Sequence, residues 1–432
     1  MRNRSTAIAA ALALAGCAFP YPPPALAPAS SPAAAPLTAA RVTEARPPVT
    51  ILVSIDGFRP DYLDRGATPH LDRLKTLGVS AAMRPSFPSV TFPNHWTLVT
   101  GLRPDRTGIV GNRMEDPRRP GETFTMQSDD PFWWNEAEPI WVTAEKAGIR
   151  SATMFWPGAN VAVGGTMEAG GHRTVTGGVR PRDWQQYNEA LTGEQRVAAV
   201  IDWLRRPAAI RPRLITLYFD TVDTAGHSFG PDDPRTIEAV AAVDAQIGAL
   251  IDGLATLAQP ANLVVVADHG MAATSSSRTV ALADLADPAD LRAIDTGSFA
   301  TIVPLPGRED AVARALLRRH RHVECWRKEA VPARFHYGRH LRVAPFVCLA
   351  ETGWLIVKLP PAAPFAGGAH GYDPADPAMR ALFLASGPAF AAGRRVGEFD
   401  NVDIAPLLRR LIGLPQADLD GTDAPFRSVI KR

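Results

Sequence analysis

The chain has 432 residues, 46% of them hydrophobic, so it can bury a substantial core. Its 46 basic residues nearly balance its 44 acidic residues, and the net charge is +2. A protein that grips nucleic acid would show a skewed balance or a basic run, and the sequence shows neither, so no nucleic-acid-binding surface is expected.

The N-terminal segment is typical of an export signal. A short basic stretch precedes an apolar run, Thr6 to Ala15, that is too short to span a bilayer. The run ends in Leu14-Ala15-Gly16-Cys17, which resembles the lipobox of bacterial lipoproteins, so we predict cleavage before Cys17 and a lipid on this cysteine. An ordinary secretory signal, cut after Ala25 or Ala27, is the alternative. Either signal exports the protein. The lipobox predicts a periplasmic or outer-membrane-anchored lipoprotein that meets the membrane only through its lipid.

We divide the chain into a signal peptide at residues 1–17, a tether at 18–48 and a folded domain at 49–432. The tether is rich in proline and alanine with few large apolar side chains, so it cannot bury a core and should be extended. Within the folded domain, the region at about 288–354 is expected to be less regular and peripheral.

Short apolar runs along the folded domain are typical of buried parallel strands. They are Ile51–Ile55, Ser151–Phe155, Leu214–Phe219, Leu263–Ala267 and Ala381–Ala385. Between them, apolar residues at spacings of three and four predict helices at Glu189–Leu204 and Pro234–Leu257. Strands that alternate with helices predict an α/β fold with a mostly parallel central sheet and helices on both faces.

Aspartates and histidines follow several of these runs. Ligands of open α/β sheets bind beyond the carboxyl ends of the strands, and several buried carboxylates at one edge require a cation. A single aspartate after a strand is more often a helix cap, so the prediction depends on the joint pattern. Carboxylate and imidazole together suit zinc-like ions. We predict two metals with three protein ligands each, from the set Asp56, Asp223, His227, Asp268, His269 and His370.

The candidate nucleophile precedes a predicted helix. Residues Asn94–Thr100 read as the opening of this helix, with Pro93 near its first position. Thr91 then lies at the helix N-terminus, where an anion is favoured, and a metal-bound hydroxyl can be deprotonated there. Spacing alone does not exclude Ser86 or Ser89, and Thr91 could serve only as the helix cap.

Two cysteines remain in the folded domain, Cys325 and Cys348. In an oxidising compartment such a pair can form a disulfide. Two buried thiols are the alternative, because the sequence does not give the Cα distance that a disulfide needs.

Seven short motifs occur in an order that resembles the ectonucleotide pyrophosphatase/phosphodiesterases of the alkaline phosphatase superfamily. They are Ser54–Arg59, Thr91–His95, Asn112–Met114, Phe155–Gly158, Asp223–His227, Asp268–Met271 and His370–Asp373. Lys328–Pro332 and His336-Tyr337 also look like the family. The resemblance covers Val49 to Thr422, and the extra domains of animal members are absent, so the chain resembles a bacterial single-domain member with an alkaline phosphatase-like fold.

The resemblance implies a role for each matching residue. Thr91 would be a nucleophile that forms a covalent phosphothreonine, and Asn112 would hold a phosphate oxygen. The implied cofactors are two Zn²⁺ ions or other divalent metals. One ion would take Asp56, Thr91, Asp268 and His269, and the other would take Asp223, His227 and His370.

The resemblance also implies a nucleotide pocket. Phe92 and Tyr187 would stack on the base, and Trp156 would line the same pocket. The chain departs from the family at Asn160, where an acidic residue is common, which puts base contacts there in doubt. It departs again at Asp220–Asp223, where the family commonly has a Glu-Glu-Pro-Asp-like run.

The implied activity is hydrolysis of nucleotide phosphodiester or pyrophosphate bonds, with release of nucleoside 5′-monophosphate. A lysophospholipid or choline-phosphate diesterase is the main alternative. A sulfatase is disfavoured because threonine cannot become formylglycine, and a phosphomonoesterase because no cationic cluster accompanies Thr91. A non-catalytic binding lipoprotein is a third interpretation. It is disfavoured because all the expected ligands and the nucleophile are present.

Overall fold

The structure is a computed structural model that describes residues 46–168 and 174–431. The folded unit begins at Arg46. The predicted signal peptide, most of the predicted tether and Cys17 lie outside the described residues.

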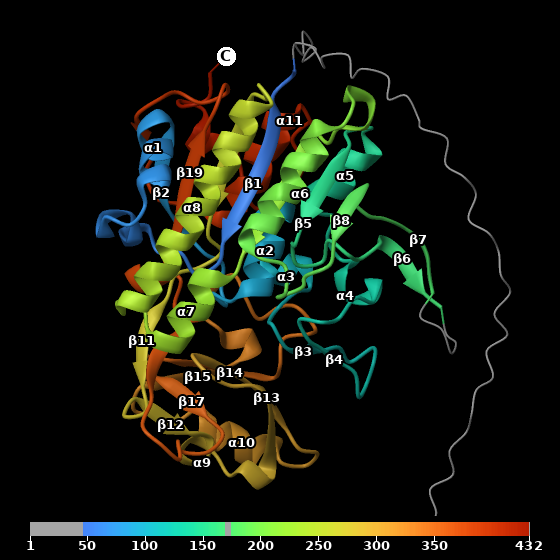
Figure 1. The fold of residues 1–432 in the computed structure, drawn as a ribbon. Helices are drawn as coiled ribbons and strands as arrows, with labels where there is room; N and C mark the ends of the chain where they lie inside the picture. The colour runs from blue at the N-terminus through green and yellow to red at the C-terminus, as the bar shows by residue number, and fades with distance from the viewer. Residues whose placement is uncertain (1–45, 169–173, 432) are drawn as a thin grey trace, which may run out of the picture. The chain divides into compact units, whose positions relative to one another are not determined.

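A nine-stranded sheet forms the centre of the folded unit (Figure 1). Its strands follow the order β20, β2, β19, β10, β1, β9, β5 and β8, and β21 also pairs with β2. Their bounds are β1 Val49–Ile55, β2 Val79–Arg84, β5 Ser151–Met154, β8 Asp183–Gln185, β9 Leu214–Phe219, β10 Ala261–Val266, β19 Ala381–Ser386, β20 Arg394–Arg395 and β21 Phe399–Asp400.

The middle of this sheet is parallel, as predicted. Strand β1 lies between β10 and β9 and runs parallel to both, and β5 continues the parallel order to β8. Every residue of β1 is buried, as expected for a strand covered on both faces. Strand β19 differs from the prediction because it is antiparallel to both β10 and β2. A fully buried apolar run has no pattern that records its direction, so the run at Ala381–Ala385 could not reveal this reversal.

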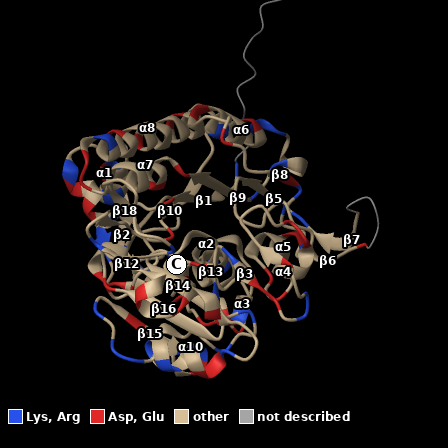
Figure 2. Ribbon diagram, turned by 90° about the horizontal axis from the view of Figure 1, so that it is seen from below, with Lys and Arg blue, Asp and Glu red and all other residues tan. Residues whose placement is uncertain are grey.

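Helices cover both faces of the sheet (Figure 2). Helices α1, α6, α7 and α8 form one layer, and α2, α5 and α11 pack on the other side. Their bounds are α1 Pro69–Leu77, α2 Thr91–Thr100, α5 Ile140–Lys146, α6 Gly193–Arg205, α7 Thr221–Phe229, α8 Pro234–Thr256 and α11 Ile404–Ile412. Helix α6 begins later than predicted because Thr192 caps it in a capping box with Gln195.

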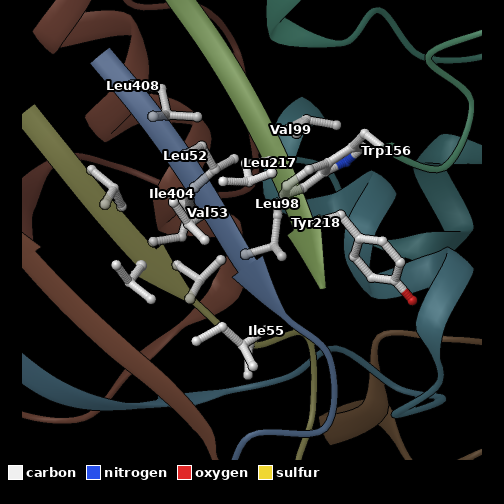
Figure 3. Packing of buried hydrophobic residues seen from close by; sticks show 14 of the residues in the cluster. Leu52, Val53, Ile55, Leu98, Val99, Trp156, Leu217, Tyr218, Ile404 and Leu408 are labelled. Carbon is white, nitrogen blue, oxygen red and sulfur yellow. The ribbon is translucent and has the colours of Figure 1, made fainter. Parts of the chain in front are cut away.

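The core fills the space between the sheet and these helices. Leu52 of β1, Leu98 of α2 and Leu408 of α11 belong to one buried cluster (Figure 3). Helix α8 is long and apolar enough to cross a membrane by length and composition, but its buried face packs against α6 and α7. This packing makes it a core helix of the folded unit.

The region expected to be less regular instead forms a four-stranded antiparallel sheet with its own core. Its order is β13, β14, β16 and β15, with bounds β13 Leu291–Asp295, β14 Phe299–Pro304, β15 Val323–Arg327 and β16 Phe346–Ala350. Cys325 and Cys348 lie opposite each other on β15 and β16 and are joined by a disulfide. This sheet differs from the expectation of a less regular region. Strand β15 alternates buried and more exposed residues, and neither β13 nor β15 contains a continuous apolar run.

Candidate active site

The ends of three adjacent parallel strands bring acidic side chains together. Asp56 follows β1, Asp268 follows β10, and α7 begins just beyond β9 and carries Asp223 and His227. Because β1 is hydrogen-bonded to both neighbours in register, these strand ends meet at one edge of the sheet. His370 comes from the end of β18 (Ala366–Ala369), which pairs with β11 (Ala272–Ser275) and so returns to the same edge.

Three of these side chains form a first donor group. The Nε2 atom of His227 lies 3.4 Å from Asp223 Oδ2 and 3.0 Å from His370 Nε2. The distance from His370 Nε2 to Asp223 Oδ1 is 3.6 Å. The three side chains that the resemblance assigns to one metal therefore converge on one point.

The second donor group surrounds His269. Its Nε2 atom lies 3.0 Å from Asp268 Oδ2, 3.4 Å from Asp56 Oδ1 and 3.4 Å from the Thr91 hydroxyl. The His269 ring also stacks on His370, with 3.6 Å between ring centroids. The two groups are thus adjacent, and a ring from each forms their boundary.

All three histidines of these groups present the same nitrogen to the site. The Nδ1 atoms of His227, His269 and His370 each lie within 3.0 Å of a backbone carbonyl oxygen, to which they can only donate. In the neutral ring this leaves Nε2 unprotonated, with a free lone pair. Two such lone pairs, on His227 and His370, face each other at 3.0 Å and cannot hydrogen-bond to each other. A cation between them resolves this contact, so the donor set fits a metal.

The carboxylates support the same conclusion. One buried oxygen on each of Asp56, Asp223 and Asp268 has no hydrogen-bond partner. An unpaired buried carboxylate oxygen is costly unless a cation meets it. Each of these oxygens belongs to one of the two donor groups, so a cation would stabilise both groups.

Burial shifts the protonation of these groups. It raises the pKa of Asp56 well above its usual range, and the nearby carboxylates of Asp268 and Asp223 raise it further. Burial also raises the pKa of Asp223. It lowers the pKa of His370, as do the neighbouring His269 and His227, and this favours the neutral imidazole. For Asp268, burial acts to raise the pKa, but His269 and His95 hold it well below its usual range.

The Thr91 hydroxyl lies beside the second donor group, and Thr91 also lines a cavity at this edge of the sheet. It is the first residue of α2, and the N-cap is Val90, which makes no side-chain cap. Thr91 is therefore not the helix cap. The competing hydroxyls are buried and used elsewhere: Ser86 donates to Asn401 Oδ1 at 2.8 Å and Ser89 to the Tyr372 carbonyl at 2.9 Å.

Asn112 lies beside the start of the same helix. Its Oδ1 atom accepts a hydrogen bond from the backbone N–H of Phe92 at 2.9 Å. This bond orients the amide, because the carbonyl side is occupied and the NH₂ group remains as the donor. Asn112 and Thr91 both line the same cavity, so that NH₂ group is available to an oxygen bound there.

The cavity has a volume of about 630 Å³ and begins at the donor groups. Phe92 and Tyr187 both line it, as does Trp156. Trp156 is nearly buried, however, and its indole N–H donates to the His95 carbonyl, so only its edge contributes. Tyr187 is 45% exposed, and its hydroxyl donates to Asp220, which also pairs with Arg196.

Two residues beside the donor groups had no role predicted from the sequence. The Tyr218 hydroxyl donates to Asp56 Oδ2 at 2.7 Å, and both side chains are buried. His95 lies with Nδ1 2.9 Å from the Thr91 carbonyl and 3.3 Å from Asp268 Oδ2. The sequence offered two signals: a tyrosine near the end of the mostly apolar strand β9, and a histidine four residues after Thr91 on α2.

Sequence comparisons identify relatives across most of the chain. The family model "Type I phosphodiesterase / nucleotide pyrophosphatase" matches residues 50–373. An uncharacterized pyrophosphatase/phosphodiesterase from Schizosaccharomyces pombe is 36% identical over 86% of this chain and 78% of its own length. Human ectonucleotide pyrophosphatase/phosphodiesterase family member 5 is 36% identical over 86% of this chain and 76% of its own length. Human family member 1 is 34% identical, and this chain spans 42% of its length.

Solved structures of family member 5 are also similar to this chain. The human protein gives a TM-score of 0.82 at 34% identity, with 89% of this chain and 100% of that chain covered. A mouse protein in complex with AMP gives the same TM-score, identity and coverage. That mouse protein carries a threonine-to-alanine substitution and is described as inactive.

Proposed function

Because the chain belongs to the type I phosphodiesterase/nucleotide pyrophosphatase family, and is thereby a hydrolase of phosphoric ester or anhydride bonds, we propose that it cleaves phosphodiester or pyrophosphate bonds of nucleotides. The product would be a nucleoside 5′-monophosphate. One observation carries this proposal: the Thr91 hydroxyl lies 3.4 Å from His269 Nε2 in a cavity that Phe92 and Tyr187 also line. As part of the same proposal, the chain is a bacterial member of the family.

Two zinc ions, or other divalent metals, would occupy the two donor groups. Asp56, Asp268 and His269 with Thr91 would hold one, and Asp223, His227 and His370 would hold the other. When bound, such ions lower the pKa of a coordinated hydroxyl and stabilise negative charge on phosphate oxygens.

Thr91 would then act as the nucleophile. Its Oγ1 atom forms a bond to phosphorus as the bond to the leaving oxygen breaks, which gives a phosphothreonine. Water attacks that phosphorus in a second displacement and releases the nucleoside monophosphate and Thr91. Two in-line displacements predict net retention of configuration at phosphorus. The inactive threonine-to-alanine variant of the mouse relative supports a threonine in this role.

Asn112 and the cavity walls would position the substrate. The Asn112 NH₂ group, oriented by its bond to the Phe92 N–H, would donate to a phosphate oxygen. The exposed Tyr187 ring and the partly buried Phe92 ring offer aromatic surfaces for a base. The AMP complex of the mouse relative is consistent with a nucleotide in this position.

Parallel assays of three substrates test the proposed function. Purified protein should hydrolyse p-nitrophenyl thymidine monophosphate far faster than p-nitrophenyl phosphate or lysophosphatidylcholine. A clear preference for p-nitrophenyl phosphate would overturn the diesterase assignment. A preference for lysophosphatidylcholine would replace the nucleotide with a lipid diester as substrate.

A pair of aromatic variants tests the base-binding role of Tyr187. Tyr187→Ala should raise KM for the nucleoside diester by about 10-fold, because a stacking surface worth about 1–3 kcal/mol is lost. Trp184→Ala is the matched control, since Trp184 is 39% exposed but does not line the cavity. Equal effects of the two variants would argue against a nucleobase at Tyr187.

We also propose that the protein is exported and carries a lipid on Cys17. The membrane would then meet the protein only through this lipid. Labelling with radioactive palmitate should mark the wild type and leave Cys17→Ala unlabelled. Export without label in the wild type would favour the ordinary secretory signal.

A further inference from the structure

One asparagine side chain makes three hydrogen bonds to the loop before Thr91. Helix α2 has no side-chain N-cap, and the preceding residues Ser86–Val90 are all buried. The NH₂ group of Asn94 donates to the carbonyls of Pro88 and Val90 at 2.9 and 2.8 Å, and its Oδ1 atom accepts the Ser86 N–H at 2.8 Å. The side chain of Asn94 thus ties the loop at Ser86–Val90 to the first turn of the helix.

The fourth hydrogen bond of Asn94 comes from a distant part of the chain. Asn401 donates from Nδ2 to Asn94 Oδ1 at 2.8 Å, and its own Oδ1 accepts the Ser86 hydroxyl at 2.8 Å. A primary amide can make two donor bonds and accept two, so Asn94 is fully used and its orientation is fixed. Asn94 and Asn401 are both 0% exposed, and Ser86 is 1% exposed.

The fold brings Asn401 to this position by strand pairing. Asn401 follows β21, which is parallel to β2 with Asp400 opposite Arg84. Asp400 accepts from Arg84 at 2.6 Å and from Arg103 at 2.7 Å, which anchors the segment on both sides. Asn401 does not line the cavity, so any effect it has on the reaction passes through Asn94 and the loop.

We propose that Asn401 is a positioning residue for Thr91, acting through the amide of Asn94. The proposal rests on the proposed function, in which Thr91 attacks phosphorus. The ring of bonds among Ser86, Asn94 and Asn401 fixes the Val90 carbonyl, and Thr91 is the next residue. A reacting atom misplaced by about 1 Å costs on the order of 10²-fold in rate, so loosening this ring should affect turnover more than binding.

Matched asparagine variants test the proposal. Asn401→Ala should lower kcat for the nucleoside diester by about 10- to 100-fold, with KM within about threefold and metal content unchanged. Asn262→Ala is the control, because Asn262 is also buried and accepts the Ala389 N–H at 2.9 Å. Asn262 lies near the start of β10, away from the end that delivers Asp268, so its loss should lower the melting temperature with kcat unchanged.

Hydrogen exchange provides a readout that does not depend on activity. Asn401→Ala should speed exchange of the backbone amides at residues 86–94, and Asn262→Ala should not. Ser86→Ala keeps the Asn94–Asn401 bond, so it is the substitute test if Asn401→Ala does not fold. It should show a smaller loss of kcat than Asn401→Ala. Full kcat in Asn401→Ala, or in Ser86→Ala if that variant alone folds, would overturn the positioning role while the proposed function stands. No diesterase activity in the wild type would overturn the proposed function and this role with it.

Discussion

The carboxylate of Asp56 has two different neighbours. One oxygen accepts the Tyr218 hydroxyl at 2.7 Å, and the other is buried with no hydrogen-bond partner. The hydroxyl therefore fixes the plane of the carboxylate and directs the free oxygen toward His269. A residue that orients a ligand in this way commonly affects metal affinity by 10–100-fold.

A tyrosine variant tests this orientation. Tyr218→Phe keeps the ring and removes only the hydroxyl, so we expect the affinity for one of two metal ions to fall by about 10-fold or more. Competition with a chelator, followed by measurement of bound zinc, would check the result. Tyr62→Phe is the matched control, because the Tyr62 hydroxyl is buried without a hydrogen-bond partner. Equal affinities in all three proteins would contradict this role for Tyr218.

At the residue scale, the sequence predicted those site residues whose positions depend on local order along the chain. Asp56 and Asp268 directly follow apolar runs, and the Asp223–His227 spacing places both side chains on one helix face, so their convergence follows from parallel strands. The contacts of Tyr218, His95 and Asn401 could not be predicted in this way. Tyr218 contacts Asp56, His95 contacts Asp268 and Asn401 contacts Asn94 across large distances in sequence, and no periodicity encodes such a partner.

At the scale of elements, the second sheet is the main structural addition to the predicted fold. It is closed by the disulfide between β15 and β16, whose cysteines are 23 positions apart. The two donor groups lie on other segments, and Ser298, just before β14, links this sheet to the site by donating to the His370 carbonyl. The disulfide therefore contributes to stability more than to chemistry.

Removal of this disulfide should lower stability and spare activity. The double variant Cys325→Ala/Cys348→Ala should lose about 2–4 kcal/mol of unfolding free energy, because its unfolded chain is no longer cross-linked. Urea denaturation would measure the loss, and wild type treated with dithiothreitol should show a similar shift. An unchanged denaturation midpoint would argue that the cross-link does not form in solution.

Sequence patterns predicted which strands are buried but not the direction of every strand. The continuous burial of β1 and β9 was predicted together with their parallel pairing, and both are observed. The same pattern in β19 accompanies an antiparallel strand, because direction is set by the connection that precedes it. Despite this reversed strand, the structural similarity to family member 5 over 89% of the chain confirms the alkaline phosphatase-like α/β fold.

At the scale of the whole molecule, ion pairs join distant segments around Glu136. This carboxylate contacts His340 at 2.6 Å, Arg118 at 2.6 Å and the buried Arg342 at 3.1 Å. Arg342 also donates to the carbonyls of Gly108 and Trp133. The hydrogen bond from His340, with Arg118 and against the effect of burial, holds the pKa of Glu136 down at about 2.

This pKa predicts a specific dependence of stability on pH. A depressed carboxyl pKa stabilises the fold above the ordinary glutamate value of 4.5, and the contribution is lost as the pH falls toward about 2. Glu136→Gln should therefore be less stable at neutral pH by about 0.5–1 kcal/mol, because solvent screens these partly exposed ion pairs, and the difference from wild type should shrink below pH 4.5. Thermal melting between pH 7 and pH 3 would measure it, with the exposed Glu238→Gln as control. A difference that stays constant with pH would contradict this coupling.

The most direct test of the account concerns Thr91 and its metals together. Thr91→Ala should abolish turnover of the nucleoside diester, while metal content stays near two ions per chain, because Asp56, Asp268 and His269 still converge beside the missing hydroxyl. Wild type stripped by chelation should also be inactive and should recover when zinc is restored. Undiminished turnover by Thr91→Ala would remove Thr91 as the nucleophile and contradict the central claim.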